Sequence, residues 1–104
     1  MIGEGTNDMA LVEAVDWQTW SQAHDAVIID VREPFEWVMG TLPGAELISL
    51  GSLFGRVGEL DSDRAILFIC RTGNRSGVAA KLLTQYGFRE VANLTGGLVA
   101  LGLA

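Results

Sequence analysis

Two short runs of consecutive apolar residues dominate the hydropathy pattern of the chain. Residues 26–31 read Ala-Val-Ile-Ile-Asp-Val, and residues 65–70 read Ala-Ile-Leu-Phe-Ile-Cys. Both runs are rich in β-branched or bulky apolar side chains, and both are too short for a typical helix. Because they are apolar at successive positions, both faces of each segment would be buried. The pattern predicts two central strands of a parallel sheet that is covered on both sides.

Weaker signals predict three further strands, at residues 11–14, 45–48 and 90–92. Segments with helical character separate all five strands, so that strands and helices alternate along the chain. This alternation predicts an α/β sandwich built on a parallel sheet. In such folds ligands bind at the carboxyl ends of the strands. A functional site is therefore expected where a strand leads into a helix.

The predicted helices differ in the strength of their signals. Asp16 is a candidate N-cap for a short helix that carries Trp17 and Trp20 on one face. Pro34 suits the first turn of a second helix that extends through Met39. A third helix is expected within part of 51–60. The strongest pattern begins at Ser76, has apolar residues at helical spacing, and ends at Gly87, a common residue after a helix C-terminus.

Composition narrows the class of protein. The 104 residues, 49% hydrophobic, suit a single domain at 10–104 after a flexible N-terminal segment at 1–9. With one Cys and one His, the chain has neither an internal disulfide nor the ligands of a structural zinc site. The net charge of −6 argues against a nucleic-acid partner. No apolar run is long enough to span a membrane and no secretory signal is recognisable, so we expect a cytoplasmic protein.

The loop between the most apolar strand and the strongest helix carries the candidate chemistry. It reads Cys70-Arg71-Thr72-Gly73-Asn74-Arg75-Ser76. Gly73 can adopt a positive φ without steric cost and Asn74 tolerates the left-handed region, so the loop can curl with its N–H groups pointing inward. Such a concavity binds anions. The positive end of the following helix and two arginines add to this effect, and together they favour the thiolate of Cys70 over the thiol.

Packing alone offers a competing interpretation of Cys70. A single cysteine at the end of an apolar strand is commonly a small buried hydrophobic residue. Packing gives no reason, however, for two arginines and a glycine beside the thiol. The loop composition therefore favours a nucleophilic Cys70 that needs no partner base.

These segments resemble a rhodanese domain. The resemblance is carried by CRTGNRS at 70–76, IDVRE at 29–33, LPGA at 42–45 and NLTGG at 93–97, and it covers about 11–101. It implies a three-layer sandwich with a central, mainly parallel five-stranded sheet. Two positions depart from the family pattern: Thr41 replaces a frequent His, and Leu101 replaces a frequent Trp. These departures concern the shape of the pocket and the packing of the last helix.

The resemblance implies a thiosulfate sulfurtransferase in which Cys70 carries the sulfur and residues 71–76 form the cradle. The donor would be thiosulfate or another sulfane-sulfur compound, and the acceptor would be cyanide, a small thiol or a protein thiol. Sulfur would move through a Cys70 persulfide in two alternating half-reactions. We expect no cofactor, no metal, no nucleic acid and no membrane partner, and we expect a monomer.

Two other functions remain open at this point. A Cys-dependent phosphatase or arsenate reductase has a similar loop, but its arginine follows the cysteine after five residues, whereas Arg75 follows Cys70 after four. The second alternative is a rhodanese-like module that binds a partner or senses oxidants without turnover.

Two further residues are candidates for support of the site. Asp30 ends a predicted strand and would either accept hydrogen bonds from the Cys loop or stabilise its own turn. Arg32 lies four residues before Glu36, which favours a structural ion pair between them over contact with substrate.

Overall fold

A computed structural model describes residues 9–104 as an all-parallel five-stranded sheet with the strand order β1-β5-β4-β2-β3. The predicted flexible segment at 1–9 lies, apart from Met9, outside the described residues. The strands are β1 (Ala10–Val12), β2 (Val27–Asp30), β3 (Glu46–Leu47), β4 (Ala65–Ile69) and β5 (Glu90–Leu94). All five predicted strands are therefore confirmed, with boundaries shifted by at most two residues.

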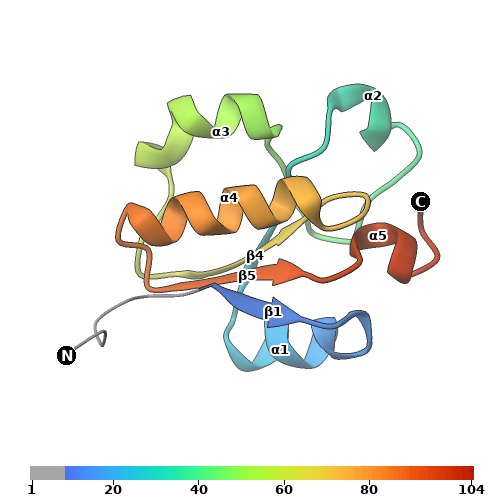
Figure 1. Cartoon of the computed structure of the whole chain (residues 1–104), viewed down its shortest axis with the longest axis horizontal. Coiled ribbons are helices and arrows are strands. Elements are labelled where there is room, and N and C mark those ends of the chain that lie inside the picture. The colour runs from blue at the N-terminus through green and yellow to red at the C-terminus, as the bar shows by residue number, and fades with distance from the viewer. Residues whose placement is uncertain (1–8) are drawn as a thin grey trace.

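Helices lie on both faces of the sheet, as the apolar central strands predict (Figure 1). The helices are α1 (Trp17–Ala23), α2 (Pro34–Trp37), α3 (Leu50–Arg56), α4 (Asn74–Gln85) and α5 (Gly97–Ala100), with 3₁₀ turns η1 (Ala14–Asp16) and η2 (Val57–Glu59). Helices α3 and α4 cover one face, and α1 lies on the other. None of the helices in the described range is long and apolar enough to span a bilayer.

Strand β4 supplies side chains to both halves of the core. Ile66, Phe68 and Cys70 belong to the apolar cluster beneath α3 and α4, together with Leu53 and Leu83. Leu67 and Ile69 of β4 belong to the cluster on the opposite face. Because every residue of β4 is buried, this strand is fixed on both sides. Cys70, which follows it directly, is held on the face that α4 covers.

Three of the predicted helices differ from the structure in a boundary or in a capping bond. Helix α4 begins at Asn74, two residues before the predicted start at Ser76, and Asn74 is therefore helical instead of left-handed. Helix α2 ends at Trp37, short of the predicted Met39. Asp16 is the residue before α1, but its side chain forms no capping hydrogen bond because the 3₁₀ turn η1 leads directly into the helix.

The last helix packs against the backbone of the Cys loop. The N–H groups of Leu98 and Val99 donate to the carbonyl oxygens of Cys70 (2.9 Å) and Arg71 (3.0 Å). Gly97 adopts φ +61°, and a Cβ at this position would lie 2.4 Å from the Arg71 carbonyl oxygen and 2.6 Å from that of Cys70. Only glycine allows this approach. Leu101, at the end of α5, packs against the core on the α1 side.

This close approach predicts that Gly97→Ala destabilises the fold by about 2–4 kcal/mol, because the new methyl group overlaps backbone atoms at a left-handed position. Gly55→Ala is the matched control, since a Cβ at Gly55 in α3 meets nothing within 4 Å. The control should raise the free energy of unfolding by about 0.5–1 kcal/mol. Urea unfolding of both variants measures the difference, and equal stability of the two would contradict the predicted clash.

Candidate functional site

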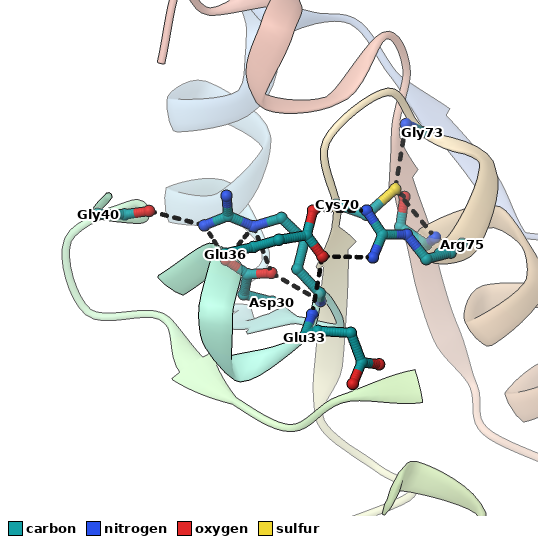
Figure 2. Close-up of polar contacts among 9 residues, drawn as sticks. Asp30, Glu33, Glu36, Gly40, Cys70, Gly73 and Arg75 are labelled. Atoms are coloured by element: carbon teal, nitrogen blue, oxygen red, sulfur yellow. Dashed lines mark hydrogen bonds and ion pairs between the residues drawn. The ribbon is translucent and has the colours of Figure 1, made fainter. Parts of the chain in front are cut away.

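Three hydrogen-bond partners surround the sulfur of Cys70. The backbone N–H of Gly73 lies 3.1 Å from Sγ and that of Ser76 lies 3.3 Å from it, and both donate to it. The Ser76 hydroxyl lies 3.2 Å from the same atom. Figure 2 shows Gly73 above the sulfur, on the loop that curls from the end of β4 into α4. The inward N–H groups expected from the loop sequence are therefore present.

Gly73 makes this ring possible. It adopts φ +99°, a left-handed conformation, and it is the residue immediately before α4. The turn it forms aims its own N–H and the N–H of Ser76, in the first turn of the helix, at one point. The positive end of the 12-residue helix α4 then adds its dipole at the sulfur. A negatively charged sulfur is the species that this arrangement stabilises.

The thiol is enclosed as well as hydrogen-bonded. Cys70 is only 1% exposed, and it is a free cysteine. Burial by itself would also suit the packing interpretation of this residue. Two N–H donors directed at one sulfur, with a hydroxyl in contact with it, are more than packing requires, however, because an apolar thiol needs no such partners.

Arg75 forms a bidentate ion pair with Glu36 instead of joining the ring around the sulfur. Its two terminal nitrogens lie 2.6 and 2.9 Å from the carboxylate oxygens of Glu36, as Figure 2 shows. The hydrogen bond from Arg75 is the main cause that lowers the pKa of Glu36 from 4.5 to about 2, and the N–H of Glu33 adds to the effect. Glu36 in turn raises the pKa of Arg75. The prediction that Glu36 pairs with Arg32 is therefore wrong.

Arg32 pairs with Asp30, and both side chains are buried. The guanidinium donates through Nε and Nη2 to the Asp30 carboxylate at 2.8–3.1 Å, and Nη2 also donates to the Gly40 carbonyl at 2.7 Å. Thr41, the position that departs from the family pattern, donates its hydroxyl to the same carboxylate at 2.6 Å. These bonds brace the segment after β2. Asp30 thus stabilises its own turn, and the expectation that it orients the Cys loop is not met.

The other loop residues predicted to bind substrate have exposed side chains. Arg71, Thr72 and Asn74 all face solvent. Arg71 also lines an open cavity of about 510 Å³ beside the loop, to which Phe35 and Met39 contribute apolar surface. Phe35 is 76% exposed, so its ring lies at the surface beside this cavity. The cavity is the opening next to the Cys loop that a substrate could use.

Asn93 is a residue of the site that the sequence analysis did not identify. It lies buried near the end of β5, beside the Cys loop. Its Oδ1 accepts a hydrogen bond from the Ser76 hydroxyl at 2.5 Å, and its Nδ2 donates to the Gly73 carbonyl at 3.1 Å. A polar residue at the end of a strand next to the cysteine strand was the available signal. Recognising it required the strand order, which the sequence does not state.

Comparisons with known proteins agree with this geometry. Residues 13–103 match the family described as the rhodanese-like domain. The chain is 33% identical over 94 residues to a sulfurtransferase of Allochromatium vinosum, an alignment that covers 86% of this chain and 88% of that protein. It is 34% identical over 76 residues to a thiosulfate sulfurtransferase of Pseudoalteromonas translucida, over 73% and 72% of the two chains.

Solved structures share the fold. A rhodanese-related protein from Thermoplasma volcanium superposes with a TM-score of 0.76 at 30% identity, covering 86% of each chain. A protein of Bacillus anthracis whose crystal structure is described as reduced CoADR-RHD gives a TM-score of 0.81 at 29% identity, covering 91% of this chain and 17% of that one.

The Glu36–Arg75 pair predicts a pH-dependent contribution to stability. Because the pKa of Glu36 is lowered from 4.5 to about 2 in the folded protein, the contribution is complete above pH 4.5 and is lost as the pH falls toward 2. The side chain of Arg75 is 35% exposed, so solvent screens the pair. We expect Glu36→Gln to lower the free energy of unfolding by about 1–2 kcal/mol at pH 7.

Urea unfolding of the wild type and Glu36→Gln at a series of pH values measures the difference in their free energies of unfolding. This difference should shrink below pH 4.5. Glu59→Gln is the matched control, since the Arg56–Glu59 pair lies on the surface with side chains 46% and 61% exposed and should matter little. A Glu36→Gln difference that stays constant down to pH 2 would contradict the prediction.

Proposed function

Since this chain belongs to the rhodanese-like family of sulfurtransferases, we propose that it moves sulfane sulfur from thiosulfate or a persulfide donor to cyanide or a thiol. The sulfur travels as a persulfide on Cys70. The observation that carries the proposal is the convergence of two backbone N–H groups and the Ser76 hydroxyl on the sulfur of Cys70. These groups stabilise a thiolate, which is the nucleophile that sulfur transfer requires.

The first half-reaction loads the sulfur. The Cys70 thiolate attacks the outer sulfur of thiosulfate and a new S–S bond forms. The bond between the two sulfurs of thiosulfate breaks, and sulfite leaves with its electron pair. The negative charge then lies on the outer sulfur of the persulfide. No oxidant and no proton donor are needed, which suits a site whose cysteine has hydrogen-bond donors but no histidine partner.

The second half-reaction returns the enzyme to its starting state. Cyanide, or the thiolate of an acceptor, attacks the outer sulfur, and the persulfide S–S bond breaks. Its electron pair stays on Cys70, whose thiolate the ring of donors again stabilises. Cyanide becomes thiocyanate, and a thiol acceptor becomes a persulfide. Such alternating steps through a covalent intermediate give ping-pong kinetics.

We propose that a sulfur donor approaches the loop through the cavity that Arg71 lines. Its wall includes Arg71, which brings a positive charge to the entrance, and Glu36, whose charge Arg75 balances. A thiosulfate dianion is therefore attracted to the opening in a protein that is acidic elsewhere. Because Cys70 is 1% exposed, the loop must open slightly for the outer sulfur of the donor to make contact.

The phosphatase alternative is less well supported. A loop that binds a tetrahedral oxyanion would place an arginine at position 76, where this chain has a buried serine bonded to Asn93. The guanidinium of Arg75 is bound to Glu36. The described residues thus leave a small ring that suits one additional sulfur atom. Hydrolysis of an aryl phosphate by the protein would reverse this preference.

Intact mass after incubation with thiosulfate, without reductant, tests the proposal. The expected result is the gain of one sulfur atom, which cyanide then removes. Cys70→Ser is the control and should gain nothing. The same pair of proteins should differ in thiosulfate:cyanide turnover, with no rate above background for the serine variant. An unchanged mass of the wild type would leave only the binding-module interpretation.

The charge at the entrance predicts the behaviour of Arg71→Gln. This variant should show a kcat/KM for thiosulfate that is lower by about tenfold, mainly through a higher KM, because an exposed cation no longer attracts the dianion. Raising the salt concentration should reduce the difference from the wild type. Arg89→Gln, whose side chain is also exposed and lies at the other end of α4, is the control and should retain wild-type kinetics.

A further inference from the structure

The hydroxyl of Ser76 has two possible acceptors for its single proton. One is Oδ1 of Asn93, at 2.5 Å, and the other is Sγ of Cys70, at 3.2 Å. Ser76 is fully buried and Asn93 is 7% exposed, so water does not supply a substitute for a missing partner. The direction of this one O–H group therefore depends on the balance between the amide oxygen and the sulfur.

The orientation of the Asn93 amide is fixed by the Cys loop itself. Nδ2 donates to the Gly73 carbonyl at 3.1 Å, and a carbonyl accepts hydrogen bonds but never donates them. Turning the amide over would place Oδ1 against that carbonyl oxygen and would break both hydrogen bonds. Gly77 permits the contact, since a Cβ there would lie 3.2 Å from Nδ2. The oxygen of the Asn93 amide thus faces Ser76.

We propose that Asn93 is a positioning residue that sets the state of Cys70 through the Ser76 hydroxyl. While Cys70 is a thiol, the hydroxyl donates to Asn93, and its lone pairs face the S–H group. When the sulfur becomes a thiolate, the hydroxyl turns to donate to it, and the Asn93 oxygen loses its buried donor. Asn93 therefore opposes ionisation in the resting enzyme.

This inference deepens the proposed function, because it concerns the nucleophile on which sulfur transfer rests. The test uses alkylation of Cys70 by iodoacetamide, a reaction that needs no sulfur donor. The measured quantity is the pH dependence of the alkylation rate. The charged side chains on the elements around the ring are Arg71 and Arg75 of the loop, Glu36 of α2, and the buried Asp30–Arg32 pair at the end of β2, the strand beside β4. All of them are unchanged in the variants below, so a shift in the profile reports on the change at Asn93.

We expect Asn93→Leu to move the alkylation profile to lower pH by about one unit, because the freed hydroxyl donates to the thiolate without orphaning a buried oxygen. Asn93→Asp keeps an oxygen for the hydroxyl but adds a negative charge, and it should move the profile to higher pH. A residue that only supports packing would not give opposite shifts. Gln85→Leu, an exposed amide at the far end of α4, is the matched control and should leave the profile unchanged.

The double variant Ser76→Ala/Asn93→Leu decides whether the effect passes through the hydroxyl. It should have the same profile as Ser76→Ala alone. Asn93→Ala removes the same oxygen without adding bulk, and it replaces the leucine variant if that variant fails to fold. Its alkylation profile should shift in the same direction. An unchanged profile in the folded Asn93 variants, or a shift that persists without the Ser76 hydroxyl, would overturn the proposal.

Discussion

The hydrogen bonds from the Gly73 and Ser76 N–H groups to the Cys70 sulfur are the constraint on which the site depends. Both N–H groups belong to the junction between β4 and α4, and they point at one atom only because Gly73 is left-handed. A side chain at that position would meet the backbone nitrogen of Gly96 at 3.1 Å. The ring is thus held by its own turn and by the segment after β5 that packs against it.

The charged residues near the loop serve mainly to hold this geometry. Arg75 joins α4 to α2 through Glu36, and Arg32 braces the segment after β2 through Asp30. Both arginines are therefore engaged within the protein, which leaves Arg71 as the exposed loop cation. The division has a chemical consequence. Oriented N–H dipoles face the sulfur inside the protein, and in the proposed function the positive charge that would attract an anionic donor lies outside, at the entrance.

The sequence was sufficient for the parts of the structure that depend on local pattern. The apolar runs that became β2 and β4, the glycine of the Cys loop and the alternation of strands and helices all follow from neighbouring residues. Pairings between distant segments did not follow. Glu36 could pair with Arg32 at helical spacing, but α2 begins at Pro34, so Arg32 lies before the helix and binds Asp30. Glu36 meets Arg75 across the fold instead. Asn93 was missed for the same reason, since its role depends on β5 lying beside β4.

The burial of Cys70 links the fold to the proposed chemistry. In an enclosed ring, N–H dipoles act on the sulfur without competition from water, and they stabilise a thiolate more strongly than they would at the surface. The same enclosure limits how much can be added to the sulfur. A persulfide adds one atom and moves the charge outward by one bond, whereas a phosphoryl group adds a tetrahedral centre with three oxygens. Since Ser76 stands where an arginine would balance those oxygens, and the nearby Arg75 is bound to Glu36, the charges around the ring favour sulfur over a phosphoryl group.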